Sequence, residues 1–500
     1  KKEQGFAIGS FGDTSRVIED WEGLFLVRRV ADAAEPELAL SLWGKMDPFQ
    51  PLPCHMIDAG HVAQALLDTA TYAGVRRRLE TATGCPSGIL RNWLGYIVAL
   101  HDWGKGWRNF QARGPSHLTA PLLKEGLSLT QDEIEKTVRH EVISRVWVEE
   151  HLKDWGGWNR RSLRTVGIAV EAHHGRMHQR GPVLFQFPGY DQWDALRKEA
   201  EEMVRGAFEL QPWEADFADH SVAGILLSGL IVFADWIASN EELFALRWKG
   251  EPWSDYIGRS RTEANRAVGL LGFGTDNPWA ESCLFIEQWP TFANPRPIQV
   301  ACSELAQSEA IPGLVIVEAP MGEGKSEAAL YLGSQWLQSG GGMFMALPTA
   351  ATSNQMFNRV RAFTGEHHPE AEAGVQLVHG TSWLVDRGTP LNPPEVFDEE
   401  EDPYGYLALD WFRPRKRSLL ATYGVGTIDQ ALMAVMHVKH SFLRLFGLAG
   451  KVLVIDEVHA YDAYMSQYLQ MALEWMGAYH VPVIMLSATL PGQQREAFVR

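Results

Sequence analysis

The sequence predicts a multidomain protein in which an all-α bundle is followed by an α/β lobe with a parallel sheet. Up to about residue 270, long apolar segments recur without the alternation that strands show. After about residue 297, short β-rich segments alternate with helical ones, and a proline-bearing stretch separates the two patterns. Long apolar segments favour buried helices, whereas strand, loop and helix in succession favour a parallel sheet covered by helices. A chain of 500 residues can bury a separate core in each part.

The helices of the first part are predicted by apolar segments that are too long for strands. These segments are 91–100, 141–152, 163–172 and 222–238. Glycine and proline separate them, notably at 112–116 and 181–189, where turns are favoured. We therefore expect an all-α domain over residues 1–270 and a linker over residues 271–297.

The strands of the second part are predicted by short apolar segments, each followed by a loop and a helical stretch. They are 314–319, 343–348, 451–457 and 481–489. This alternation assigns residues 298–500 to one α/β lobe. The segment 388–404 is acidic and rich in proline, which is typical of an exposed insertion.

Composition predicts a globular protein of a reducing compartment. Hydrophobic residues make up 46% of the chain and charged residues 21%, which is ordinary for such proteins. The 4 cysteines are scattered without a CxxC pair, which argues against a disulfide framework. We see no apolar segment of the ~18 residues that a membrane span needs, and the first residues lack the apolar core of a secretory signal. We expect a cytoplasmic protein without a membrane partner.

The net charge of −17 does not suggest a nucleic-acid-binding protein, because such proteins usually carry an overall basic balance. Two local basic runs, 76–78 and 413–417, are more often a solvated surface than a binding groove. Contacts to phosphate would therefore depend on local patches and on backbone N–H groups at helix N-termini.

Histidines and aspartates end or interrupt the apolar helices of the first part. His101 and Asp102 close one helix, His173 and His174 close another, and Asp235 lies inside a third. An ionised carboxylate buried in such a helix costs several kcal/mol (roughly) unless it is paired or bound to metal. A lone histidine is more often a hydrogen-bonded core residue, but two adjacent pairs at helix ends reverse that balance. Helices that place ligands at one depth of a bundle predict a di-metal site.

The segment 319–326, APMGEGKS, has the features of a phosphate-binding loop. It follows a predicted strand and opens a predicted helix, as such a loop requires. Backbone N–H groups around Gly322 and Gly324 would hold phosphates, Lys325 would bind the β and γ oxygens, and Ser326 would bind Mg²⁺. Downstream, Asp456 and Glu457 end a β-rich segment. Asp456 would hold Mg²⁺ through water and Glu457 would activate the attacking water.

The second part resembles the first RecA-like lobe of superfamily 2 helicases. The resemblance rests on APMGEGKS, on DEVH at 456–459 and on SAT at 487–489, with Ala319 in place of the usual first glycine. It implies that Gln299 reads adenine and that His459, Ser487 and Thr489 couple the ATP state to the grip on a strand. It also implies strand contacts by Thr349, Ser353, Asn354, Thr427 and Asp429. Without the family, the last five would pass as ordinary helix-capping residues.

The first part resembles the HD phosphohydrolase superfamily, and in particular the nuclease domain of the CRISPR-associated helicase–nucleases of type I systems. The resemblance rests on the order His, His-Asp, His, His-His, Asp. It implies that one metal is held by His55, His101, Asp102 and Asp235. A second metal would be held by Asp102, as a bridge, with His140, His173 and His174. Lys105 would neutralise charge on the scissile phosphate.

Two of these assignments leave alternatives open. His61 competes with His55, and His117 and His151 compete with His140, because each lies nearby in the sequence. An imidazole-rich site favours Fe, Mn, Co or Ni over Mg, which prefers oxygen ligands. We therefore expect two transition-metal ions in the HD site, and ATP with Mg in the helicase lobe.

The resemblance implies a single-stranded DNA nuclease coupled to an ATP-dependent translocase that moves 3′ to 5′. It also implies a monomer that is recruited to an RNA-guided surveillance complex of the Cascade type and degrades invader DNA. The second RecA-like lobe is expected to be missing from these 500 residues, so that ATP binding would be weak while the HD site would cut alone.

Two other functions remain open at this stage. One is an HD phosphohydrolase of nucleotides or cyclic dinucleotides with a regulatory ATP-binding lobe. The other is an ATP-driven remodelling protein in which the HD bundle serves only for docking.

Overall fold

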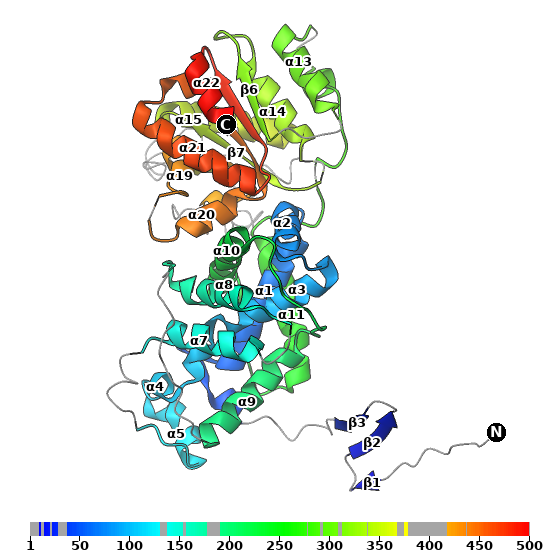
Figure 1. Cartoon of the computed structure of the whole chain (residues 1–500), viewed down its shortest axis with the longest axis vertical. Helices are drawn as coiled ribbons and strands as arrows, with labels where there is room; N and C mark the ends of the chain where they lie inside the picture. The colour runs from blue at the N-terminus through cyan, green and yellow to red at the C-terminus, as the bar shows by residue number, and fades with distance from the viewer. Residues whose placement is uncertain are drawn as a thin grey trace, which may run out of the picture.

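The protein consists of a helical part and an α/β part that are stacked along its longest axis (Figure 1). The computed structural model describes residues 10–11, 15–20, 23–28, 38–130, 138–153, 157–177, 191–277, 279–290, 294–308, 313–337, 339–367, 375–378, 418–436 and 438–499. This architecture confirms the predicted fold class. The segments 388–404 and 413–417 lie outside the described residues, so the expectations for them stay predictions.

The helical part is built from long helices packed around α1, which is almost wholly buried. They are α1 (Leu52–Asp68), α2 (Ala73–Thr83), α3 (Ser87–Ala99), α7 (His140–Lys153), α8 (Arg160–Glu171), α9 (Asp191–Gly206), α10 (His220–Ala238) and α11 (Trp253–Leu270), with the short α4 (Arg108–Gln111) and α5 (Ser116–Lys124). The predicted apolar segments lie in α3, α7, α8 and α10. Helices α1, α2, α9 and α11 were not foreseen.

Small β elements precede the helices. A hairpin of β4 (Trp43–Met46) and β5 (Phe49–Pro51) packs on the start of α1. Near the N-terminus, β1 (Ser10–Phe11), β2 (Ser15–Asp20) and β3 (Gly23–Arg28) pair as an antiparallel sheet that stands apart in Figure 1. The expectation of an almost wholly helical first part was therefore incomplete over its first residues.

Helix α10 is a second largely buried helix of the first part, packed against α1 and α8. Its N-terminus is capped by Asp219, whose side chain accepts hydrogen bonds from the backbone N–H of Ser221 and Val222. Among the described helices it alone is long and apolar enough to cross a membrane by length and composition, and 78% of it is buried inside the structure. Burial against the other helices accounts for its apolar character.

The α/β part is built on six parallel strands. They are β6 (Leu314–Glu318), β7 (Gly342–Leu347), β8 (Val375–Val378), β9 (Tyr423–Thr427), β10 (Lys451–Ile455) and β11 (Val483–Ser487), in the sheet order β6-β11-β10-β7-β9-β8. Helices α13 (Pro297–Ala306), α14 (Lys325–Gln335), α15 (Ala350–His367), α19 (Ile428–Leu432), α20 (Ser441–Leu448), α21 (Ala463–Ala478) and α22 (Gly492–Val499) cover it, and the short α12 (Phe285–Gln288) precedes them. Strands β8 and β9 were missed, since β9 reads YGVGT and two glycines dilute its β character.

The basic run 76–78 on α2 contributes hydrogen bonds between the two parts. Arg77 donates a hydrogen bond to the carbonyl oxygen of Ser339 (2.9 Å), and Arg78 donates to that of Ala478 (2.5 Å). Tyr72 donates to the carbonyl oxygen of Leu420 (2.6 Å) nearby. The run is partly solvated, as expected, because Arg77 is exposed, but two of its guanidiniums also bind backbone of the α/β part.

Candidate functional site

Two short 3₁₀ turns present histidines to the same point in the helical part. The turn η3 (Leu100–Gly106) continues α3 and carries His101, whereas η4 (Ala172–His174) continues α8 and carries His173. In both turns the Nδ1 atom lies against the carbonyl oxygen three residues earlier, at 2.8 Å for His101 and 2.7 Å for His173. A carbonyl only accepts, so Nδ1 carries the proton in both rings. In the neutral form of each ring, the Nε2 lone pair is then available to a ligand.

The first cluster gathers His55 from α1, His101 from η3 and Asp235 from α10. One ligand atom of each lies within 4.8 Å of the others. The Nε2 atom of His55 is 3.2 Å from Oδ2 of Asp102 and 3.4 Å from Oδ1 of Asp235. The Nε2 atom of His101 faces the same two oxygens at 3.4 and 3.6 Å. These are the four residues that were expected to hold the first metal.

The second cluster gathers His140, His173 and His174, again with one ligand atom of each within 4.8 Å of the others. The Nε2 atoms of His140 and His173 lie 3.4 and 3.6 Å from Oδ1 of Asp102. One oxygen of Asp102 therefore faces the first cluster and the other oxygen faces the second. The two oxygens are placed as a bridging role of Asp102 requires, and that role stays a prediction.

Burial and charge act against each other in the first cluster. Burial alone would lower the pKa of His101, but Asp102 and Asp235 raise it to about 10. Burial alone would raise the pKa of Asp102, but Lys105 and His101 hold it well below its usual range. The pKa of Asp235 is likewise held well below its usual range, because the close approach of the His101 and His55 rings outweighs burial. The cluster therefore favours positive charge between its imidazoles and carboxylates.

These residues fit a pair of metal ions. The Nε2 atoms of His101 and His173 are buried and have no hydrogen-bond partner among the described residues. Burial lowers the pKa of His173 to about 3, against the opposing attraction of Asp102, so its ring is neutral. A neutral Nε2 lone pair that points at a carboxylate oxygen places two hydrogen-bond acceptors against each other. A cation bound between the two acceptors would stabilise this arrangement. The donor set is rich in imidazole, as transition metals prefer.

Lys105 lies beside the clusters, as expected. Its Nζ atom is 2.5 Å from Oδ2 of Asp102, and its side chain is 18% exposed. The ammonium group is therefore held at the site while part of the side chain remains open to solvent.

Two residues next to the site escaped the sequence analysis. Glu141 is buried, with Oε2 3.6 Å from Nδ1 of His140 and 3.9 Å from Nε2 of His174. A Cβ on Gly104 would lie 2.0 Å from the carbonyl oxygen of His140. Glu141 directly follows a metal candidate, which was a usable signal. The need for glycine at 104 arises from a contact between distant segments and has no local signature.

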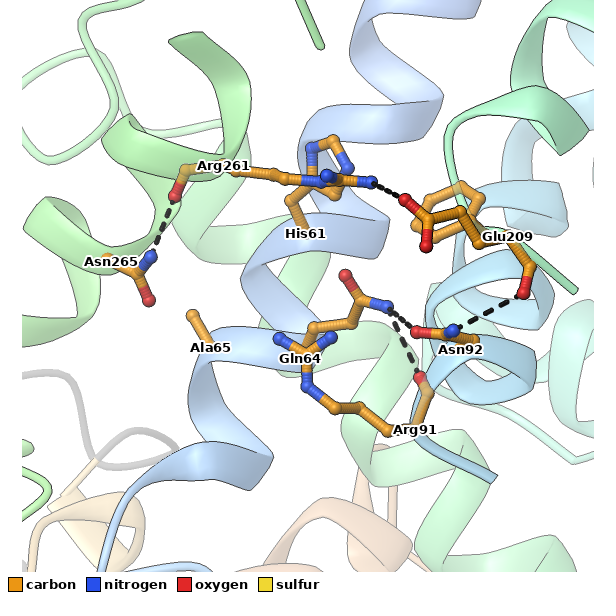
Figure 2. Close-up of a pocket in the computed structure, with 9 residues that line it drawn as sticks. His61, Gln64, Ala65, Arg91, Asn92, Glu209, Arg261 and Asn265 are labelled. Carbon is orange, nitrogen blue, oxygen red and sulfur yellow. Dashed lines mark hydrogen bonds and ion pairs between the residues drawn. The ribbon is translucent and has the colours of Figure 1, made fainter. Parts of the chain in front are cut away.

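The competing histidines lie elsewhere. Figure 2 shows His61 in a different pocket, of about 240 Å³, with Gln64, Arg91 and Arg261 in its wall. The Nδ1 atom of His61 is 2.8 Å from Oγ of Ser260. Neither described cluster includes it, so the geometry favours His55 over His61.

The two competitors of His140 are also outside the clusters. The Nε2 atom of His151 is 3.0 Å from the hydroxyl of Tyr96 and 3.4 Å from Glu201. His117 is exposed on α5. The geometry therefore favours His140 in the second cluster.

The phosphate-binding loop has the expected form at the end of β6. Gly322 and Gly324 have φ of 82° and 77°, a region that side chains other than glycine rarely adopt. Lys325 is the first residue of α14. Its side chain donates hydrogen bonds to the carbonyl oxygens of Ala319 (2.7 Å) and Pro320 (3.2 Å). Ser326 follows it in the first turn, where it is partly exposed.

Gln299 packs directly against this loop from α13. A Cβ on Gly324 would lie 2.3 Å from Nε2 of Gln299, and the other end of the amide accepts from the backbone N–H of Arg296 (2.9 Å). The Gln299 side chain is thereby held beside the loop, as an adenine-reading residue requires.

The acidic pair lies at the end of β10. Burial raises the pKa of Asp456, while Lys325 and Arg359 pull it down. Asp456 also accepts from the backbone N–H of Glu457 (2.8 Å), which has φ of 53°. The structure therefore brings the lysine of the loop and both acidic residues together.

The three coupling candidates contact one another. The Nδ1 atom of His459 is 3.3 Å from Oε2 of Glu457 and 3.3 Å from Oγ of Ser487. Ser487 donates to the carbonyl oxygen of Thr489 (2.8 Å). His459 thus joins the acidic pair to the segment after β11.

The five strand-contacting candidates lie after β7, at the end of β9 and directly after β9. Thr349 caps α15 by accepting from the backbone N–H of Thr352 (3.2 Å), and Ser353 is buried, donating back to the carbonyl oxygen of Thr349 (2.8 Å). Asn354 follows on α15 and is partly exposed. For Thr349 and Ser353 the structure thus shows capping and helix-internal bonds. In contrast, Thr427 makes no side-chain cap bond, and Asp429 is exposed.

One edge of the sheet collects all these motifs. The phosphate-binding loop follows β6, the segments with Thr349 and Thr427 follow β7 and β9, and the acidic pair and Ser487 follow or end β10 and β11. Because all six strands are parallel, their carboxyl ends meet at one edge, where ligands of α/β sheets bind.

Comparison with known proteins agrees with this geometry. Residues 43–244 match the family model described as "Cas3, HD domain". A CRISPR-associated endonuclease/helicase Cas3 of Thermus thermophilus is 36% identical over 480 residues, which is 93% of this chain and 51% of that protein.

Solved structures extend the similarity over both parts. The crystal structure of T. fusca Cas3 with AMPPNP superposes with a TM-score of 0.79 at 30% identity, covering 92% of this chain and 51% of that one. A chain of a pre-nicking CRISPR RNA-guided surveillance complex gives a TM-score of 0.67 at 28% identity, covering 92% and 49%. The chain spans about half the length of the curated relatives it matches.

Proposed function

Because this chain belongs to the Cas3 family of CRISPR-associated nuclease/helicases, we propose that its two sites serve one activity, the degradation of invader DNA. The helical part would cut single-stranded DNA with bound metal, and the α/β lobe would contribute to ATP-dependent movement along that strand, 3′ to 5′. The observation that carries the proposal is the Asp102 carboxylate, which faces a donor cluster with each oxygen.

In the helical part, six side chains and the shared carboxylate of Asp102 would hold two ions. Bound there, two cations would activate water, orient the scissile phosphate and stabilise the leaving oxygen. The imidazole-rich donor set favours Fe, Mn, Co or Ni for this role. Lys105 holds its ammonium group at Asp102, with a side chain 18% exposed, and would pair with a phosphate oxygen of the strand.

In the α/β lobe, the residues around the phosphate-binding loop would hold ATP and Mg. Lys325 reaches the loop carbonyls and would exchange them for the β and γ oxygens of the nucleotide. Ser326 and Asp456 would bind Mg, and Glu457 would orient the attacking water. Gln299, held against Gly324, would read the base.

The partners follow from the family. We propose single-stranded DNA as the substrate, a Cascade-type RNA-guided surveillance complex as the recruiting partner, and a cytoplasmic monomer. The similarity to a chain of such a complex supports this, as do Thr427 and Asp429 beside the phosphate-binding edge.

The nuclease is tested on circular single-stranded DNA with Mn²⁺, Co²⁺, Mg²⁺ or a chelator. Cutting is expected with Mn²⁺ or Co²⁺, without ATP, and is expected to vanish with chelator. Asp102→Asn, which removes the bridging charge at nearly constant size, should reduce cutting by at least about 100-fold, as loss of a shared metal ligand does.

The matched control is Asp68→Asn. Asp68 ends the same helix that carries His55, but its carboxylate pairs with Arg91 (2.6 Å) on the surface. This variant should cut like the unaltered protein. Intact DNA in every lane, from folded protein that has bound metal, would overturn the proposal. Release of phosphate from nucleotides or cyclic dinucleotides would then favour the small-molecule phosphohydrolase.

A further inference from the structure

We propose that His440 of the α/β lobe is a positioning residue for the metal clusters of the helical part. His440 would hold the turn that carries His173 and His174, and the helix that carries Asp235, at the spacing that two ions need. The inference rests on the proposed function, because it concerns the same clusters.

The first contact is with the residue that follows the second cluster. Gly175, directly after His174, accepts a hydrogen bond at its carbonyl oxygen from the backbone N–H of His440 (2.9 Å). Gly175 has φ of 95°, and a Cβ there would lie 2.4 Å from both Cε1 and Nε2 of His440. The Nε2 edge of the imidazole therefore lies directly against the backbone at this position. The end of η4 is fixed by a residue more than 260 positions downstream.

The second contact is with the helix of the first cluster. The ring of His440 packs against Trp236, with centroids 5.4 Å apart, and Trp236 is the neighbour of Asp235 on α10. Seven residues before Trp236 on the same helix, about two turns away, a Cβ on Gly229 would lie 2.3 Å from Cβ of Phe446. Helix α20, which His440 precedes, is thus packed closely along α10 (Figure 1).

His440 adopts a backbone conformation that a residue with a side chain rarely takes. Its φ is 63° and ψ is 28°, in the left-handed region, and its side chain is buried. Such a conformation is unfavourable in a residue other than glycine, and it persists where surrounding contacts require it. Here the requirement is to place a ring on Gly175 and Trp236 at once.

The same segment contacts the helix that carries one of the strand motifs. Arg444 on α20 donates to Oε1 of Gln430 on α19 (3.2 Å), and α19 carries Asp429 and begins after Thr427. Helix α20 leads into β10 and the acidic pair. The element that packs beside the two clusters is therefore hydrogen-bonded to the helix that carries Asp429 and is followed in the chain by the strand that ends at the acidic pair.

The test uses the 500-residue chain with its metals removed and measures the binding of Mn²⁺ by calorimetry, without any nuclease assay. His440→Asn keeps a residue that tolerates the left-handed region but removes the ring from Gly175 and Trp236. We expect two Mn²⁺ sites in the unaltered protein. In the variant, the affinity of the second site, at His140, His173 and His174, should be roughly tenfold lower, because loss of a residue that supports a metal ligand reduces affinity by about this factor.

His440→Phe separates packing from a general loss of stability. It restores a ring of similar shape and should bring the second affinity back to within about threefold of the original. Arg77→Ala is the matched control, since Arg77 joins the two parts at Ser339 and touches neither η4 nor α10 in any described contact. It should leave both affinities unchanged.

Three results would decide against the inference. Equal affinities in His440→Asn and the unaltered protein would overturn it while leaving the proposed nuclease intact. A lower melting temperature without any change in metal affinity would assign His440 a purely structural role. Absence of Mn²⁺ binding by the unaltered protein would remove both this inference and the proposed function.

Discussion

The Nε2 atom of His55 lies 3.2 Å from Oδ2 of Asp102, so that a helix near the start of the chain and a turn 47 positions later meet at one carboxylate. His61 lies on the same helix, about two turns onward, but in a different pocket (Figure 2). The orientation of α1 therefore separates two histidines that the sequence could not rank.

This separation predicts opposite outcomes for two substitutions on one helix. His55→Ala should lower cutting of single-stranded DNA by about 100-fold, because a ligand of the first metal is lost. His61→Gln should keep cutting within a few-fold, since its ring bonds Ser260 and lies in neither cluster. Nuclease rates with Mn²⁺, normalised to folded protein by circular dichroism, compare them. Equal losses would contradict the assignment of His55.

The contact between Gly104 and α7 predicts a steric effect. A Cβ at 104 would lie 2.0 Å from the carbonyl oxygen of His140, so Gly104→Ala must push η3 and α7 apart. We expect a loss of stability of about 1–3 kcal/mol, as overpacking costs, together with weaker Mn²⁺ binding. Urea denaturation and calorimetry measure the two effects.

Gly258→Ala is the matched control, because a Cβ at that helical position meets nothing within 4 Å. It should raise stability by about 0.5–1 kcal/mol and leave metal binding unchanged. If both alanine variants behaved alike, the close approach at Gly104 would not matter for the site.

The contacts of the loop around Lys325 predict which substitutions weaken ATP binding. Lys325→Ala should weaken binding of a fluorescent ATP analogue by at least about tenfold, because the cation that pairs with the phosphates is removed. Gly324→Ala should weaken it as well, since a Cβ there would lie 2.3 Å from Nε2 of Gln299. Lys124→Ala, an exposed lysine on α5, is the control. Unchanged binding in both loop variants would contradict the nucleotide site.

Lys451 predicts a pH dependence of stability. It begins β10, and burial lowers its pKa from 10.5 to about 7. Between these values the unfolded chain binds one proton more than the folded protein. Stability therefore rises with pH from about 7 toward 10, by at most about 1.4 kcal/mol per pH unit. Below pH 7 the cost of the buried charge is fully present.

Lys451→Met should remove this rise. The variant should be more stable than the unaltered protein at pH 6, and the difference should shrink as the pH increases to 10. Urea denaturation at pH 6, 7, 8 and 9 tests this, with Lys124→Met as the exposed control. A difference that stays constant with pH would show that Lys451 does not change its protonation on unfolding.

The order of motifs along the chain was enough to predict the fold class and the family. Local spacing carries that information: a glycine-rich loop between a strand and a helix, an acidic pair at the end of an apolar strand, and histidine pairs at helix ends each need only a few adjacent residues. Strand β9 escaped because its glycines hide its β character, although the motif at its end was recognised.

Distances between segments decided the rest. The choice of His55 over His61, the division of Asp102 between two clusters, the closeness of Glu141 and the need for Gly104 all depend on how helices far apart in sequence pack. The contact of His440 with Gly175 joins two parts of the chain whose relation no local pattern records. Side chains meet across a core through packing geometry, and one residue's neighbours in the chain do not specify its neighbours in space.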